Sequence, residues 1–260
     1  PRLDRLVAIL KEMGSVLVCY SGGIDSAFVL AVAHRVLGEN CIGMTAVSPS
    51  LAPFELEDAV SIARGIGARH ELVDSHEIDD EAYAKNDVDR CFHCKSELYR
   101  LSAKKQADWQ IAHVVNGTNL DDLGDYRPGL EAAKEAGARS PLVEAQLTKA
   151  DVRSLAQAIG LGIWDKPAAA CLSSRLPYGT RVTRERLEVL RAADHIVSEE
   201  IRGAGFYDKV WQSFCVLLPV RSVGVMGDAR TYEETCAIRA VSSIDGMTAE
   251  AFEFPGGFLP

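Results

Sequence analysis

The first half of the chain alternates short apolar runs with longer stretches in which apolar residues recur at helical spacing. The apolar runs predict strands at residues 16–20, 41–47, 68–73 and 111–116, and the longer stretches predict helices at 25–37, 54–66 and 90–107. Strands that alternate with helices pair in parallel through right-handed crossovers. The pattern therefore predicts an α/β fold, a parallel sheet flanked by helices.

The pattern changes after residue 150. A helix is expected at 151–159, followed by an irregular stretch at 164–181 that is typical of an active-site loop. A long helix is expected at 184–202, and the segments 209–214, 215–226 and 235–242 have the composition of strands. We therefore expect a large α/β domain over 1–182 and a smaller α+β domain over 183–260.

A glycine-rich turn joins the first predicted strand to the first predicted helix, with the sequence Ser21-Gly22-Gly23-Ile24-Asp25-Ser26. Adjacent glycines let backbone N–H groups close around an anion, and the serine hydroxyls and the helix N-terminus add donors. The turn lacks the lysine of a Walker A loop. Its pattern SGGxDS resembles the PP-loop of ATP pyrophosphatases, which cleave ATP to AMP and pyrophosphate. The alternative is an ordinary turn with an Asp or Ser cap.

Two further loops, 48–50 and 117–122, leave the carboxyl ends of predicted parallel strands, where ligands bind in such sheets. We expect them to meet the PP-loop on one nucleotide. Carboxylate oxygens are the ligands that Mg²⁺ prefers, although an acidic pair can also be a solvated turn. The expected contacts are Thr45 and Ala46 beside the adenine, Gly117 and Asn119 on ATP, and Asp121 and Asp122 on Mg²⁺.

Composition limits the classes of protein to which this chain can belong. With 260 residues, 47% of them hydrophobic, the chain can bury a sizeable core and carry a small second domain. No apolar run reaches membrane-spanning length and the N-terminus is charged, so we expect a cytoplasmic protein without a membrane partner. The net charge of −9 argues against a nucleic-acid partner. Seven cysteines, an odd number, argue for reduced thiols.

Several motifs in order resemble the LarE family: SGGIDS at 21–26, RCFHCK at 90–95, DYRPGL at 125–130 with GARSPL at 137–142, and ACLSSRLPYGT at 170–180. The likeness spans about residues 5–182. It implies a PP-loop enzyme that inserts sulfur into pyridinium-3,5-biscarboxylic acid mononucleotide during biosynthesis of the nickel-pincer nucleotide cofactor. Segments 207–214 and 218–232 instead resemble the dimerisation domain of GMP synthetase, which implies a homodimer or a higher homo-oligomer.

The resemblance implies that the substrate carboxylate is adenylated and then attacked by a cysteine thiolate, best matched by Cys171. Lys166 and Arg175 are near it in sequence and would favour the thiolate, whereas an inert buried thiol is the alternative. Cleavage of the C–S bond would leave dehydroalanine, so that the cysteine is consumed. Ser174 and Arg175 are candidates for binding the substrate phosphate, with arginine as a bidentate fork.

The other cysteines allow a second source of sulfur. Cys91 and Cys94 form a CxxC motif that can chelate a metal, form a redox pair or be inert. Together with Cys171 they could hold a [4Fe–4S] cluster that carries sulfide, as in cluster-dependent members of the family. Expected in the core are Cys19, Cys41, Cys215 and Cys236. The expected cofactors are thus ATP and Mg²⁺, with the cluster as an alternative.

We therefore expect an ATP-dependent sulfurtransferase that acts on a small nucleotide. Two other enzymes are compatible with a PP-loop. A ligase or amidotransferase of the GMP synthetase type would need no cysteine, and a tRNA thiolation enzyme would need a local basic surface. An ATP-binding regulatory module is the non-catalytic alternative.

Overall fold

The computed structural model describes residues 2–124, 127–164, 166, 170–207, 209–243 and 248–258. The chain forms two compact units, Pro1–Lys166 and Pro167–Pro260, which are described in turn. This division precedes the loop that contains Cys171, whereas the domain boundary expected at residue 183 follows it; that boundary stays a prediction. Asp125 and Tyr126 of the DYRPGL motif, and residues 165, 167–169 and 208 of the other quoted segments, lie outside the described residues.

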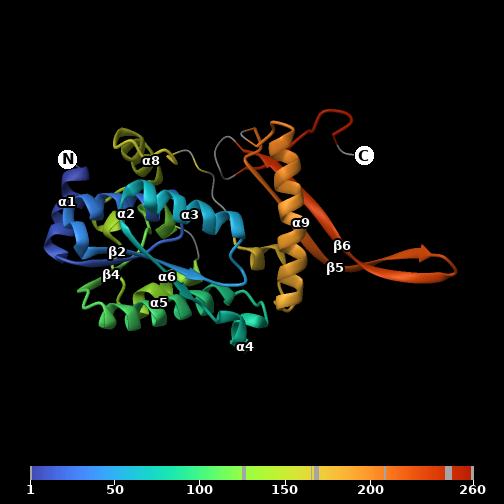
Figure 1. The fold of residues 1–260 in the computed structure, drawn as a ribbon, viewed down its shortest axis with the longest axis horizontal. Coiled ribbons are helices and arrows are strands. Elements are labelled where there is room, and N and C mark those ends of the chain that lie inside the picture. The colour runs from blue at the N-terminus through green and yellow to red at the C-terminus, as the bar shows by residue number, and fades with distance from the viewer. Residues whose placement is uncertain are drawn as a thin grey trace. The chain divides into compact units, whose positions relative to one another are not determined.

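The first unit is built on a four-stranded parallel sheet in the order β3-β2-β1-β4 (Figure 1). The strands are β1 (Val16–Cys19), β2 (Cys41–Val47), β3 (Arg69–Asp74) and β4 (His113–Val115). Val16 of β1 is in register with Cys41 on one side and with His113 on the other, so β1 is central. The predicted α/β fold with a parallel sheet is confirmed.

Helices cover both faces of this sheet (Figure 1). One face carries α1 (Arg2–Met13), α2 (Ile24–Leu37), α3 (Pro53–Ile66) and α8 (Lys149–Ala158), and the other carries α5 (Arg90–Asp108) and α6 (Pro128–Glu135). The short elements are α4 (Glu81–Ala84), α7 (Pro141–Glu144) and the 3₁₀ turns η1 (Gly38–Asn40), η2 (Glu77–Asp79) and η3 (Leu120–Gly124). The sequence pattern located α2, α3, α5 and α8 within two residues at each end and did not assign α1 or α6.

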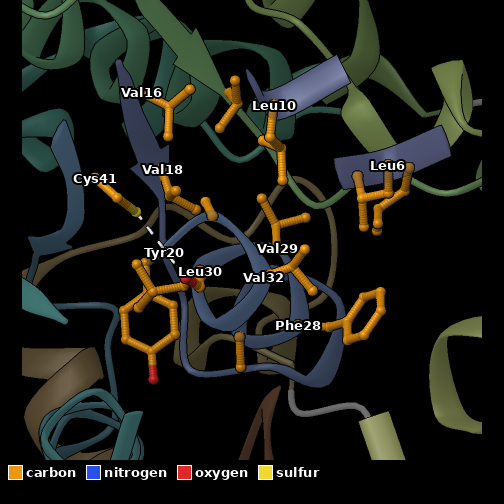
Figure 2. Close-up of a cluster of buried hydrophobic side chains, with 14 of the residues drawn as sticks. Leu6, Leu10, Val16, Val18, Tyr20, Phe28, Val29, Leu30, Val32 and Cys41 are labelled. Atoms are coloured by element: carbon orange, nitrogen blue, oxygen red, sulfur yellow. Dashed lines mark hydrogen bonds between the residues drawn. The ribbon is translucent and has the colours of Figure 1, made fainter. Parts of the chain in front are cut away.

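The larger core lies between the sheet, α1 and α2 (Figure 2). Figure 2 shows Val16 and Val18 of β1 on the side where Leu10 of α1 and Val29 of α2 lie. In α2 every residue from Ser26 to Ala33 is buried, so this helix is enclosed on all sides rather than amphipathic as its sequence suggested. It forms the centre of the domain and fixes the turn that precedes it.

The second unit contains η4 (Leu172–Arg175), α9 (Arg184–Gly203) and an antiparallel sheet in the order β5-β6-β7. Its strands are β5 (Gln212–Met226), β6 (Ala229–Ser242) and β7 (Glu250–Ala251). The segments 209–214 and 215–226, expected as separate strands, instead contribute to one strand, because the pairing of β5 with β6 runs from Gln212 to Met226 with one irregularity at Leu218–Arg221. Within the part of the chain that the structure describes, no helix has the length and apolar character to span a membrane.

Candidate active site

The glycine-rich turn lies where β1 ends and α2 begins, at the carboxyl edge of the sheet. Gly22 has a φ of +76°, and a Cβ on it would lie 2.8 Å from the Cβ of Ala59, so a side chain does not fit there. Gly23 is the N-cap residue of α2, and no described side chain caps the helix at this position. The first N–H groups of α2 therefore have the arrangement that binds anions.

The two serines of the turn form hydrogen bonds with each other. The Ser26 hydroxyl donates to the carbonyl of Gly23 at 3.0 Å and accepts the N–H of Ser21 at 3.2 Å. Its only hydrogen is then used, so the Ser21 hydroxyl, 3.1 Å away, is the donor between the two side chains. The hydroxyls therefore shape the loop through internal hydrogen bonds, and Gly23 also donates its N–H to the Ser21 hydroxyl at 3.4 Å.

The loop after β4 packs directly against this turn. A Cβ on Gly117 would lie 2.7 Å from the backbone nitrogen of Ser26, so the two backbones touch. Asn119 is buried, and its Nδ2 donates to Asp25 at 3.3 Å. The structure thus brings Gly117 and Asn119 to the PP-loop, where the sequence analysis expected ATP contacts.

Lys149, which the sequence analysis did not select, completes this group. Its ammonium is paired with the carboxylate of Asp25, and its backbone N–H donates to Asp121 at 2.8 Å. Lys149 is the first residue of α8, which begins with a capping box formed by Thr148 and Asp151. The helix was expected to begin at residue 151, two residues after Lys149. The capping-box pattern of Thr148 and Asp151 would have placed Lys149 in the first turn, where a lysine opposes the helix dipole, and this is the signal that could have identified it.

Thr45 and Ala46 lie at the carboxyl end of β2. The Thr45 hydroxyl donates to the carbonyl of Tyr20 and lies 2.8 Å from Nε2 of His70, so this nitrogen must carry the proton and donate to Thr45. Burial lowers the pKa of His70, which favours the neutral ring. Thr45 is thus held by internal hydrogen bonds, and the contacts expected between these two residues and the adenine stay predictions.

Asp121 and Asp122 are both hydrogen-bonded within their loop. Asp121 accepts the N–H of Lys149, while Asp122 accepts the N–H of Asn119 at 3.0 Å and pairs with Arg127 at 2.5 Å. Among the described residues no group of three or more His, Cys, Asp or Glu side chains could hold a metal ion. Mg²⁺ that arrives with ATP needs only one or two carboxylates beside the phosphates, so Asp121 and Asp122 remain its predicted ligands.

The CxxC motif lies in the first turn of α5. Cys91 is exposed and Cys94 is half-buried, and Nη2 of Arg90 lies 3.9 Å from the sulfur of Cys91. His93, between the cysteines, lies 3.3 Å from Asp89 and 3.8 Å from Asp80, so it pairs with carboxylates. The [4Fe–4S] cluster stays a prediction.

Cys171 is exposed on the second unit, directly before η4. Its carbonyl accepts the backbone N–H of Ser174 at 3.1 Å and the Ser174 hydroxyl at 2.6 Å. Leu172, the next residue, is fully buried. The loop backbone is therefore anchored at an exposed cysteine. Cys19, Cys41 and Cys215 are buried as expected, whereas the prediction for Cys236 is wrong because its position on β6 is exposed.

The cations expected to stabilise the Cys171 thiolate are each paired with carboxylates. Burial opposes the charge of Lys166, but Glu55 at 3.1 Å and Asp58 at 2.9 Å outweigh it and raise the pKa of the ammonium. Arg175 is buried and paired with Asp194. Binding of a substrate phosphate by Ser174 and Arg175 stays a prediction.

The chain is similar in sequence to several known proteins. The family model described as "GMP synthase C terminal domain" matches residues 199–260. An uncharacterised protein of Synechocystis sp. is 48% identical over 193 residues, which cover 74% of this chain and 72% of that protein. The glutamine-hydrolysing GMP synthase of Brucella ovis is 34% identical over an alignment that covers 99% of this chain but 54% of that protein.

The pyridinium-3,5-bisthiocarboxylic acid mononucleotide synthase of Lactiplantibacillus plantarum is 39% identical over 202 residues, which cover 77% of this chain and 72% of the synthase. This alignment spans most of both proteins. Because that synthase is a LarE protein, the chain belongs to the LarE family, and its C-terminal segment is of the GMP synthase type.

Proposed function

We propose that the chain is an ATP-dependent sulfurtransferase that adenylates a carboxylate of pyridinium-3,5-biscarboxylic acid mononucleotide and transfers sulfur to it through Cys171. The name of the Lactiplantibacillus plantarum relative specifies a bisthiocarboxylic acid mononucleotide as its product. The observation that carries the proposal is an exposed cysteine on an anchored loop in a chain that also has an uncapped, glycine-rich helix start.

The first step is activation of the substrate. A carboxylate oxygen attacks the α-phosphorus of ATP, the bond to the β-phosphate oxygen breaks, and pyrophosphate leaves. The N–H groups at the start of α2 would hold the phosphates, and Lys149 could exchange Asp25 for a phosphate oxygen. Mg²⁺, held in part by Asp121 and Asp122, would offset phosphate charge when bound.

The second step moves sulfur. The Cys171 thiolate attacks the carbonyl carbon of the acyl adenylate and AMP leaves, which forms a thioester. Loss of the Cα proton of Cys171 and cleavage of its Cβ–S bond then leave a thiocarboxylate on the product and dehydroalanine in the chain. No electron acceptor is needed, because the electrons of the C–H bond form the new double bond while those of the C–S bond leave with sulfur.

The test is the intact mass of the protein before and after reaction with ATP, Mg²⁺ and pyridinium-3,5-biscarboxylic acid mononucleotide. We expect AMP and pyrophosphate as products and the loss of one hydrogen sulfide from Cys171. ADP as the product would overturn the PP-loop assignment. Iron and sulfide that are present after anaerobic purification and absent from Cys91→Ala, Cys94→Ala and Cys171→Ala variants would instead assign the sulfur to a cluster.

A ligase of the GMP synthetase type is the second candidate, because GMP synthases align with 99% of this chain. Such an enzyme displaces AMP with ammonia and needs no thiol. A Cys171→Ala variant that keeps full single-turnover activity would favour the ligase. A variant that still releases pyrophosphate but forms no thiocarboxylate would favour the sulfurtransferase.

A further inference from the structure

Arg175 and Asp194 form an ion pair inside the second unit. Arg175 is the last residue of η4, four residues after Cys171, and Asp194 lies in the middle of α9. Both side chains are only 4% exposed. The other buried residues of α9 are aliphatic, namely Leu187, Leu190, Val197 and Ile201. A charge on such a face is costly to bury unless it is paired, so the two residues depend on each other.

Each partner also contacts another part of the unit. Nη2 of Arg175 donates to the carbonyl of Ala170 at 3.3 Å, and the guanidinium carbon lies 5.2 Å from the ring centroid of Phe214 on β5. Oδ1 of Asp194 accepts the backbone N–H of Cys215, also on β5, at 3.3 Å. The pair therefore links the residue that precedes Cys171 to both α9 and β5.

The Cys171 loop is consequently held on both sides of the thiol. Arg175 holds the carbonyl of Ala170 on one side, and Ser174 holds the carbonyl of Cys171 on the other. Neither contact involves the sulfur atom, and Cys171 is an exposed residue. We propose that Arg175 and Asp194 are positioning residues, which fix the loop so that the Cys171 sulfur can reach the activated substrate.

This proposal rests on the proposed function for the role of Cys171 but not for the geometry of the loop. It differs from direct binding of a substrate phosphate by Arg175, which would require the substrate to reach a guanidinium that is buried against Asp194. The two roles differ in what they predict for Asp194. A positioning pair needs both members, whereas a phosphate ligand needs only the arginine.

The variants are Arg175→Lys, Asp194→Asn and the double variant Arg175→Met/Asp194→Leu. The double variant replaces the ion pair with apolar groups and leaves no unpaired buried charge, so it keeps the test usable if a single variant does not fold. The control is Glu199→Gln, which removes an exposed carboxylate of α9 that pairs with Arg202 at the surface. Hydrogen exchange, single turnovers at varied mononucleotide concentration and the melting temperature are measured on the full chain. Hydrogen exchange of the amides at 171–176 is followed without any ligand. Pyrophosphate release and mass loss at Cys171 are followed in a single turnover with ATP, Mg²⁺ and pyridinium-3,5-biscarboxylic acid mononucleotide.

We expect all three variants, but not the control, to exchange faster at 171–176 and to slow the mass loss at Cys171 by about 10²-fold, the usual effect of a misplaced reacting group. Pyrophosphate release should stay within about twofold of the unaltered chain, because it precedes the thiol step. The double variant should lose no more than either single variant, since the pair acts as one unit.

Two results would overturn the proposal. If Asp194→Asn behaves like the unaltered chain while Arg175→Lys raises the mononucleotide concentration that gives the half-maximal single-turnover rate, arginine binds substrate directly. If pyrophosphate release and mass loss fall together with the melting temperature, the pair is only structural. Should the unaltered chain release pyrophosphate with no mass loss, the proposed function fails instead, and the exchange rates alone decide whether the pair holds the loop.

Discussion

Gly22 and Gly14 have similar left-handed backbones, with φ values of +76° and +72°, but different surroundings. A Cβ on Gly22 would lie 2.8 Å from Ala59, whereas a Cβ on Gly14 has nothing within 4 Å. At the scale of the single residue, both the available space and the positive φ thus restrict position 22 of the PP-loop to glycine. The close approach of Gly117 to Ser26 is a second limit of this kind.

This difference predicts the effect of two matched substitutions. Gly22→Ala and Gly14→Ala carry the same backbone strain, but only Gly22→Ala forces Ala59 or the turn to move. We expect Gly22→Ala to lower the free energy of unfolding by about 1–3 kcal/mol more than Gly14→Ala does. Urea unfolding of both variants measures this, and equal losses would show that the turn has room for a side chain.

Thiol reactivity is also set by each residue's surroundings. Burial raises the pKa of Cys41 to about 12 and raises that of Cys19, so both are protonated and shielded near neutral pH. Cys91 and Cys171 are exposed. We expect iodoacetamide at about pH 8 to alkylate the exposed pair first. Peptide mapping by mass spectrometry tests this, with urea-unfolded protein as the control in which all four should react.

At the scale of the element, the N-terminus of α8 connects stability to the site. The capping box at Thr148 starts α8 at Lys149, and Lys149 pairs with Asp25 of the PP-loop. Thr183 caps α9 in a similar way through the N–H of Arg186. The two threonines therefore have the same local role in helices with different neighbours.

We expect Thr148→Ala and Thr183→Ala each to lower the free energy of unfolding by about 0.5–2 kcal/mol. Only Thr148→Ala should also raise the KM for ATP, because fraying of the first turn of α8 displaces Lys149. Pyrophosphate release at varied ATP concentration checks this prediction. A similar change of KM in both variants would argue that stability, rather than the position of Lys149, controls ATP use.

At the scale of the whole molecule, the outer part of the β5–β6 hairpin has an apolar face. Val223 pairs with Tyr232 across the hairpin, and Val225 follows on the same face two residues later. These side chains are 60%, 57% and 78% exposed, respectively. An apolar patch on a strand pair is typical of an interface, and the segment matches the GMP synthase C terminal domain.

We therefore expect the full chain to form at least a dimer. Val223→Glu/Val225→Glu should shift it toward the monomer, because charges would be buried at the contact. Ser222→Glu, on the opposite face of β5, is the matched control and should leave the assembly intact. Sedimentation velocity at micromolar concentration measures the result. A folded monomer for the unaltered chain would contradict the prediction.

The sequence by itself determined the features whose signals are contiguous. The alternation of apolar and helical segments predicted the parallel sheet, and SGGIDS predicted an anion-binding turn, because backbone conformation there depends on neighbouring residues. The pattern located α2 but suggested an exposed polar face for it, whereas the folded helix is buried on all sides along Ser26–Ala33. It also gave no reason to join segments 209–214 and 215–226 into the single strand that pairing with β6 requires.

Only the tertiary structure decided which distant charges meet. Lys149 reaches Asp25 across 124 positions of the chain, and Arg175 is paired with Asp194 on a different helix. The local sequence pattern does not predict such ion pairs, because they form only when the sheet order and the helix packing bring separate elements together. Burial makes the pairing of Arg175 with Asp194 compulsory, since either charge alone would lose its hydration with no compensating partner, whereas Lys149 and Asp25 are partly exposed and can exchange partners.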